Sequence, residues 1–358
     1  MKHHYITLCC LSIILLLQGC SATQQHVLSA LEPASVDLAT NITKIGIINE
    51  SSGGARSNYS NHLEQLLSQR DQHLEKEGVD AAMNGLFEEL QKDQRFEDIQ
   101  LITTSAINTE GMTLTQRIPW QKIKEVCDNH GVDAIFSLAY YEADTQLSLK
   151  KKKIEEQNMM RQMVKMPGHE ITLETLIENG WRIYDPYNQE VIDELVFNRQ
   201  ITSKAQGTNP LYALESITDR RDVILEQSTE AGSNYGKRLL PQERELIRDY
   251  YVRGSKKFVA AKELVANGDW KAAAVLWRQE TTNDKLKVQA KACYNMAFYN
   301  EMNGKYELAM AWAEKATDLS KTKATNQYLN ALKERIDQQA IVQQQLQRSH
   351  LSASAAME

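Results

Sequence analysis

The chain has 358 residues, with 41 Lys and Arg against 47 Asp and Glu, and a formal net charge of −6 at pH 7. A net acidic chain has no overall electrostatic attraction to nucleic acid, which argues against that class of partner. Three of the five cysteines lie within the first twenty residues, so the composition also excludes a disulfide framework. We expect the other two, Cys127 and Cys293, to be small buried side chains on separate helices.

The first twenty residues have the features of a secretory signal. An apolar run, Leu8–Leu17, is too short to span a bilayer. Leu17-Gln-Gly-Cys20 resembles the bacterial lipobox, which implies that residues 1–19 are a cleaved signal peptide and that Cys20 carries the acyl chains. No acidic residue follows Cys20 directly, and by resemblance to lipoprotein sorting signals this implies the outer membrane, facing the periplasm. Residues 20–40 are polar and are expected to be a flexible tether.

A first domain is predicted over residues 41–240, with strands and helices that alternate. The expected elements are a strand at 44–49, a helix at 61–91, a strand at 99–102, a helix from Pro119 that ends at Gly131, and a strand at 132–149. This order is typical of parallel strands joined by crossover helices. On the last strand we expect Phe136, Leu138 and Tyr140 to share one face. Two further strands, 169–184 and 191–202, predict an antiparallel extension of the sheet.

Two segments of this domain carry hypotheses about ligands. Residues 150–166 combine Lys150, Lys151, Lys152 and Lys153 with four methionines, and we expect a helical insertion that contacts anionic lipid or a partner, or that is simply solvated. The loop Ser51–Gly54 follows a strand and precedes a helix, where it could hold an anion or act as an ordinary connection.

A second domain is predicted over residues 241–348, where a pattern recurs after 36 residues, from Gly268 to Gly304. Gly304 is expected at a turn between helices, followed by Tyr306 and the small residue Ala309. These residues resemble a tetratricopeptide repeat, and the resemblance covers about residues 254–320. We also expect a bridging helix at 241–257, a capping helix at 323–347 and a disordered tail at 349–358.

The resemblance implies a concave groove formed by the first helix of each pair. The partner-binding residues that it implies are Phe258, Lys262, Tyr294, Phe298 and Glu301. Alternatively, the three aromatic residues are core residues.

Catalytic and metal-binding motifs are not found in the sequence. The histidines are scattered without metal-ligand spacing, and no nucleophile elbow or phosphate-binding loop occurs. We therefore predict no enzyme activity, no metal and no cofactor.

The whole chain is predicted to be an α+β protein, with an N-terminal α/β domain that has a mixed sheet and a C-terminal all-α domain of repeats. The first domain resembles the TolB amino-terminal domain and the curli-export lipoproteins. The segments Gly180–Pro186, Ala231–Tyr235, Gly268–Trp270 and Tyr294–Ala297 resemble a family of Bacteroidota lipoproteins that join such a domain to repeats. The resemblance implies a non-enzymatic adaptor of the cell envelope that binds a protein or peptide partner, or alternatively a subunit of an oligomeric envelope or export assembly.

Overall fold

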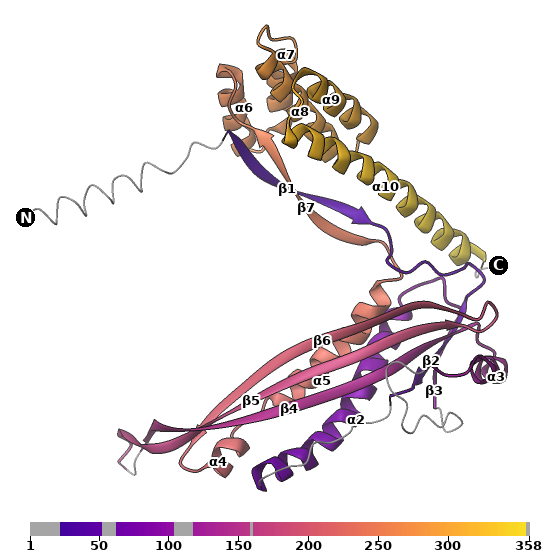
Figure 1. The fold of residues 1–358 in the computed structure, drawn as a ribbon, viewed down its shortest axis with the longest axis vertical. Coiled ribbons are helices and arrows are strands. Elements are labelled where there is room, and N and C mark those ends of the chain that lie inside the picture. Colours follow the sequence, from indigo (N-terminus) through magenta and orange to yellow (C-terminus); the bar gives the residue numbers. More distant parts are fainter. Residues whose placement is uncertain (1–21, 52–61, 104–116, 158–159, 356–358) are drawn as a thin grey trace, which may run out of the picture. The chain divides into compact units, whose positions relative to one another are not determined.

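The computed structural model describes residues 22–51, 62–103, 117–157 and 160–355 (Figure 1). The predictions for residues 1–19, for Cys20 and for the loop beyond Ser51 lie outside these residues. The chain forms two compact units, and each is built from two stretches of sequence. The sheet unit comprises residues 34–241 with the last residues of the chain from 345, and the helical unit comprises residues up to 33 with residues 242–344. The expected α+β class is confirmed, whereas the expected boundaries at 41 and 348 differ from these units.

The first half of the sheet unit is parallel, as predicted. It contains strands β2 (Lys44–Asn49), β3 (Asp98–Ile102) and the start of β4 (Ala134–Gln157), together with helices α2 (His62–Leu90) and α3 (Trp120–His130). With β5 (Met163–Asp185) and β6 (Glu190–Gly207), the strand order is β3-β2-β4-β5-β6, and β2 pairs in parallel with both β3 and β4. Gly131 ends α3 in the left-handed conformation with φ 66°, which glycine adopts without strain.

The second half is the predicted antiparallel extension, formed by β5 (Met163–Asp185) and β6 (Glu190–Gly207). The expectation that Tyr140 shares a face with Phe136 and Leu138 is wrong. The β4–β5 register shifts between Leu138 and Tyr140, and this bulge brings Tyr141 to the buried face instead. Trp181 and Tyr184 of β5 are fully buried.

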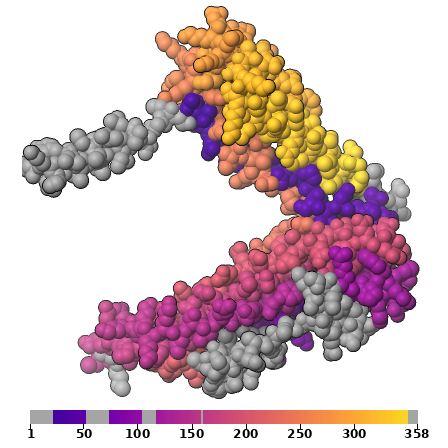
Figure 2. Space-filling view, in the orientation of Figure 1, coloured from indigo at the N-terminus to yellow at the C-terminus, as the bar shows by residue number. Residues whose placement is uncertain are grey.

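Residues 150–166 form no helix. Lys150 to Gln157 continue β4, and Met163 to Met166 begin β5. The described part of the segment is therefore the end of a long β-hairpin that extends past β6 and past helix α4 (Pro210–Glu215) (Figures 1 and 2). Four consecutive lysines interrupt the alternation of polar and apolar residues that marks a strand. The sequence of this segment therefore does not distinguish a strand from a helix.

Two helices of this unit were not predicted, α4 (Pro210–Glu215) and α5 (Arg220–Lys237). Helix α5 packs against α2 on one face of the sheet, and α3 covers the other face. Glycine permits the close approach of the two helices, since a Cβ on Gly232 would overlap the carbonyl oxygen of Ala82, and one on Gly85 would overlap that of Thr229.

In its described residues, the helical unit has a two-stranded antiparallel ribbon and five helices. These are β1 (Thr23–Glu32), β7 (Gln242–Tyr251), α6 (Lys256–Ala266), α7 (Trp270–Glu280), α8 (Leu286–Met302), α9 (Tyr306–Leu319) and α10 (Lys323–Ala355). The predicted turns are confirmed at Gly268 and Gly304, which have φ of 80° and 69°. Cys293 on α8 is buried, as is Cys127 on α3.

Three predictions for the ends of this unit are wrong. Residues 23–32 are strand β1 rather than part of a flexible tether, and residues 242–251 are strand β7 rather than a bridging helix. Residues 349–355 continue α10, where a disordered tail was expected. The strands arise because β1 and β7 supply each other's hydrogen bonds along ten paired positions, from Thr23↔Tyr251 to Glu32↔Gln242.

Candidate functional site

The β1–β7 ribbon lies on the helices of its own unit. Alternation places His26, Leu28 and Ala30 on the same face of the ribbon as Leu246 and Tyr250. Leu28, Ala30 and Tyr250 are buried, whereas Val27 and Ile247, which pair with each other on the opposite face, are 50% and 61% exposed. One face of the ribbon therefore belongs to the core of the helical unit.

An aromatic cluster joins β7 to the helices. The ring of Tyr250 stacks on that of Phe298 with 5.6 Å between centroids, and it meets Trp270 edge-on at 5.5 Å. Tyr251 meets the ring of Tyr294 edge-on at 5.1 Å. Aromatic pairs at these distances contribute beyond the area that they bury.

A buried ion pair lies in the same interface. The guanidinium of Arg248 donates through Nε and Nη2 to Glu301 at 2.9–3.1 Å, and Tyr328 donates to the same carboxylate at 2.8 Å. Burial by itself lowers the pKa of Arg248, but the hydrogen bonds and charge of Glu301 outweigh it, so that the pKa is raised. The side chain of Asn295 accepts from the amide of Tyr251 and donates to its carbonyl, both at 2.7 Å. Helix α8 thus binds β7 through an ion pair and through hydrogen bonds from one of its side chains to the backbone of the strand.

This packing corrects the predicted groove residues. Phe258, Tyr294, Phe298 and Glu301 are brought together, but they are 0–6% exposed and belong to the core, while Lys262 is exposed. The chain's own ribbon packs on this side of the helices, so Phe258, Tyr294 and Phe298 are core residues, which is the alternative that the sequence left open. Two features of the sequence could have indicated the ribbon. Residues 23–32 and 242–251 both contain apolar residues at strand spacing, and Arg248 offers a charge partner for Glu301.

A cleft of about 470 Å³ remains along β1. It is lined by His26, Val27, Leu28, Ser29, Ala30, Leu246, Glu301, Met302, Gly304, Tyr306 and Arg335. Five consecutive residues of β1 line it, which places an edge of the strand against the cleft.

Hydrogen bonding shows which backbone groups of β1 point to that edge. Val252 donates to the carbonyl of Ala22 at 3.0 Å, so residues of even number face β7. Those of odd number face away, in agreement with Arg335, which donates to the carbonyl of Leu31 at 2.6 Å. Among the described residues, the backbone groups of Val27 and Ser29 have no hydrogen-bond partner along this edge.

Charged groups in the cleft are already paired or neutral. Glu301 is bound by Arg248, and Arg335 is 3% exposed and lies over the ring of Tyr306 at 5.7 Å. Burial lowers the pKa of His26, which favours the neutral imidazole. A ligand in the cleft would therefore be held by backbone hydrogen bonds and by apolar contacts with side chains such as Val27 and Met302.

The lysine segment lies in the sheet unit. Lys150, Lys151, Lys152 and Lys153 are all exposed on β4, and Lys152 pairs with Glu170 of β5 at 2.6 Å. Met160 and Met163 near the hairpin end are 76% and 63% exposed. The arrangement places positive charge and exposed apolar side chains together on this hairpin.

A buried polar network, missed from the sequence, follows β2. Glu50 is 3% exposed and accepts from Ser137 at 2.6 Å and from Tyr184 at 3.1 Å. Arg182 lies 3.6 Å from Glu50 and donates to Glu194 at 2.8 Å. Burial raises the pKa of Glu50, and the hydrogen bond from Ser137 and the charge of Arg182 offset part of this rise. The network reaches the surface at Glu194, whose side chain is 38% exposed and also pairs with Arg117 at 3.0 Å.

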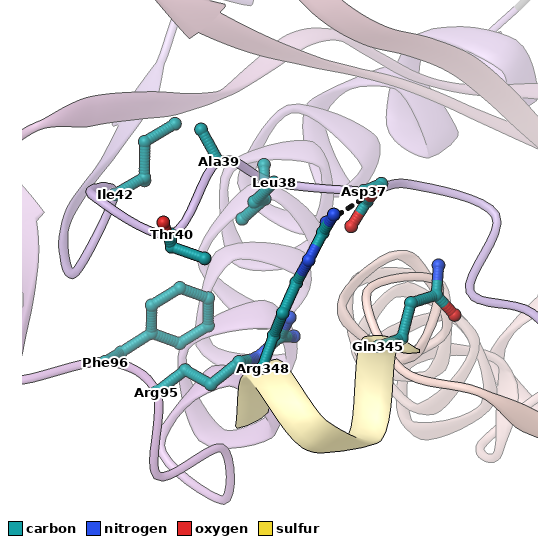
Figure 3. A pocket seen from close by; sticks show the side chains of 9 residues that line it. All are labelled: Asp37, Leu38, Ala39, Thr40, Ile42, Arg95, Phe96, Gln345 and Arg348. Atoms are coloured by element: carbon teal, nitrogen blue, oxygen red, sulfur yellow. Dashed lines mark hydrogen bonds and ion pairs between the residues drawn. The ribbon is translucent and has the colours of Figure 1, made fainter. Parts of the chain in front are cut away.

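A small cavity of about 20 Å³ also lies in the sheet unit (Figure 3). Arg348 and Arg95 border it, but Arg348 is paired with Asp37 at 3.0 Å and Arg95 with Asp93 at 2.6 Å. The volume suits one water molecule and not a larger ligand.

Within the described residues, no group of His, Cys, Asp and Glu side chains is placed to hold a metal ion. None of the helices described is long and apolar enough to cross a membrane.

Comparison with known proteins identifies the family of the chain. Residues 42–251, more than half of its length, match the family model "Domain of unknown function (DUF8603)", and the chain belongs to this family. Residues 259–334 match a second model, "Domain of unknown function (DUF6340)". The first match covers most of the sheet unit together with β7, and the second lies within the helices that follow.

Similarity to solved structures is remote, and a search of curated proteins gives no match. A PelC dodecamer from Paraburkholderia phytofirmans is 10% identical, with 59% of this chain and 96% of that chain covered and a TM-score of 0.23. A putative neuraminyllactose-binding hemagglutinin homolog from Helicobacter pylori is 12% identical, with 65% and 94% covered and a TM-score of 0.25. TM-scores this low carry no argument about fold or function.

Proposed function

We propose that this protein is a non-enzymatic scaffold of the cell envelope that binds an extended segment of a partner protein by adding it as a third strand to β1. The observation that carries the proposal is the free edge of β1 in its cleft, where the backbone groups of Val27 and Ser29 face away from β7. A strand edge offers a row of hydrogen-bonding groups that a peptide can pair with, and flanking pockets take its alternate side chains.

The proposed anchor is the acylated Cys20, on the periplasmic face of the outer membrane. The lipobox-like Leu17–Cys20 and the absence of an acidic residue directly after it support this location. It is tested by mass spectrometry of the N-terminal peptide from membranes. We expect an acylated peptide that begins at Cys20, and fractionation of a Cys20→Ser variant with soluble proteins.

Strand addition is tested by proline substitution on the free edge. Ser29→Pro removes an amide that faces the cleft and leaves the bonds to β7 intact, since proline is tolerated where the N–H is not part of the ladder. Gln25→Pro is the matched control, because Gln25 has the same orientation but does not line the cleft. Thermal unfolding shows whether both variants remain folded.

The binding readout is crosslinking from native envelopes with a photoreactive residue at Val27. We expect a defined partner that is lost in Ser29→Pro and kept in Gln25→Pro. Equal recovery from both folded variants would contradict strand addition.

A second candidate function is a subunit of an oligomeric assembly, and one observation favours it. Strand β6 is an edge of the described sheet over its 18 residues, and Val196 on it is 40% exposed. Long free edges pair with other chains. Light scattering of the purified protein separates the two candidates, since a monomer would exclude assembly through β6, and large self-complexes that are broken by proline in β6 would favour it.

A further inference from the structure

The point at which the chain enters the helical unit is fixed by the ribbon. Val252 donates to the carbonyl of Ala22 at 3.0 Å, and β1 begins at Thr23. Only two residues separate Thr23 from Cys20, and three residues of extended chain span at most about 11 Å. A lipid on Cys20 would therefore hold this end of the ribbon close to the membrane surface.

Three helices begin at the same end of the unit. Helix α6 starts four residues after Val252, and Figure 1 shows it beside the start of β1. On α8, Lys291 donates to the carbonyl of Arg253 at 3.0 Å. Helix α10 runs parallel to α8. Tyr294 in the middle of α8 contacts Tyr328 in the second turn of α10 at 4.6 Å between centroids, and further along both helices Met302 and Arg335 line one cleft.

Basic side chains gather around this end, which we call the basic rim. Its members are Arg253, Lys256, Lys285, Lys287, Lys291, Lys321 and Lys323. Lys291 is half-buried and the others are exposed. Across 251–257, 284–291 and 320–324 the one acidic residue is Asp284, in a chain with an excess of acid overall.

Helix stability does not account for this distribution. The positive end of the helix dipole lies at the N-terminus and favours acidic residues there, but the first turns of α6, α8 and α10 contain none. Leu286, between two lysines of the rim, is 61% exposed. Lysine beside an exposed leucine is typical of surfaces that lie at the boundary between headgroups and acyl chains.

We infer that the basic rim rests on anionic phospholipid headgroups and sets the orientation of the helical unit on the membrane. The inference builds on the proposed lipid anchor at Cys20, since the anchor brings this end of the unit to the bilayer. Acyl chains and a basic surface are complementary anchors, because the first fixes distance and the second selects the face that meets the lipid.

The test separates the rim from the anchor by removing the lipid. The probe is the chain from residue 20 onward with Cys20→Ser, which keeps every described residue, and it is mixed with vesicles of phosphatidylcholine with or without phosphatidylglycerol. We expect sedimentation with the anionic vesicles at low salt, little with the neutral ones, and loss at high salt.

The decisive variant replaces Lys285, Lys287, Lys321 and Lys323 with glutamine. Its matched control replaces Lys150, Lys151, Lys152 and Lys153 with glutamine, which changes the net charge equally at four exposed lysines of the sheet unit. We expect the rim variant to bind anionic vesicles at least about tenfold more weakly and the control to bind nearly as wild type, since one basic residue near such a surface contributes about fivefold.

Three outcomes would overturn the inference: equal loss in both variants, loss only in the control, or no preference of the parent chain for anionic vesicles. Because the probe carries no lipid, none of these outcomes depends on acylation. Failure of the anchor itself would be seen separately, in the mass spectrum and the fractionation of the full chain.

Discussion

Both units bury an arginine, a glutamate and a tyrosine together, but the two networks differ in completeness. In the helical unit, Arg248 binds Glu301 through two nitrogens, and Tyr328 donates to the same carboxylate. In the sheet unit, Arg182 lies 3.6 Å from Glu50 and divides its hydrogen bonds between Tyr184 and Glu194. A buried ion pair stabilises a fold only where its geometry compensates desolvation, so the first network fixes the ribbon firmly and the second leaves its carboxyl group with a raised pKa.

The largest effect is expected from breaking the complete network. Arg248→Ala strands the buried charge of Glu301, and removal of one partner from such a pair typically costs about 3–5 kcal/mol. Chemical unfolding monitored by tryptophan fluorescence measures the loss, because Trp270 and Trp277 lie in the adjoining aromatic cluster. A loss below about 1 kcal/mol, the range of exposed ion pairs, would show that the pair is solvated in solution.

A smaller effect is expected where the sheet unit depends on close helix packing. Gly232→Ala places a methyl group against the carbonyl of Ala82, and overpacking of this kind costs about 1–3 kcal/mol. Circular dichroism during thermal unfolding measures it. Gly254→Ala is a control in the helical unit, since its nearest neighbour would be the ring of Phe258 at 3.2 Å. Equal changes for both would mean that α2 and α5 adjust without cost.

Turn glycines of the helical unit offer a milder test. Gly304→Ala forces a side chain into the left-handed conformation, with φ 69° and open space around the Cβ, so the expected cost is backbone strain of about 1 kcal/mol. Gly268→Ala, with φ 80°, should behave alike. Denaturant midpoints of the two variants measure this, and a gain in stability at either would contradict the observed turn.

The smallest expected effect is a change in how the free energy of unfolding of the sheet unit depends on pH. Burial raises the pKa of Glu50 above its usual 4.5, so the folded sheet unit binds this proton more tightly than the unfolded chain does. The protonated Glu50 side chain therefore contributes to the free energy of unfolding below pH 4.5. This contribution is lost as the pH rises through the raised pKa of Glu50. Glu50→Gln should remove that decline, so unfolding curves across this range should show the variant gaining on wild type as pH rises. A constant difference would mean that Glu50 titrates normally.

Local patterns in the sequence predicted much of the fold. Continuous apolar runs identified β2 and β3, and Gly131, Gly268 and Gly304 marked helix ends through their conformational freedom. The ribbon escaped prediction because its strands are about two hundred residues apart and each is amphipathic only on one narrow face. The bulge that exchanges Tyr140 for Tyr141 is set by the partner strand, which alternation within one strand does not contain.

The sequence identified the aromatic residues of the helical unit as a group, but neither their role in its core nor the edge of β1. Phe258, Tyr294 and Phe298 are buried together in the core of the helical unit, and tyrosines of β7 contact the rings of Tyr294 and Phe298. A repeat pattern predicts which residues each helix pair places on its surface. It contains no information about a segment outside the repeat that packs on that surface. The edge of β1 escapes prediction because residues 20–40 taken together are polar, a composition that indicates a tether and not a strand.

The register of the ribbon also shows how the two units are connected along the chain. Glu32 and Gln242 are paired neighbours, so residues 33–241 amount to one long insertion at the turn of a β-hairpin. Closure of a loop of that length is entropically costly unless the insert has first brought its own ends together. The sheet unit should accordingly fold before the ribbon can close, and a short Asn-Gly turn in place of the insert should give a minimal helical protein in which the hairpin forms directly.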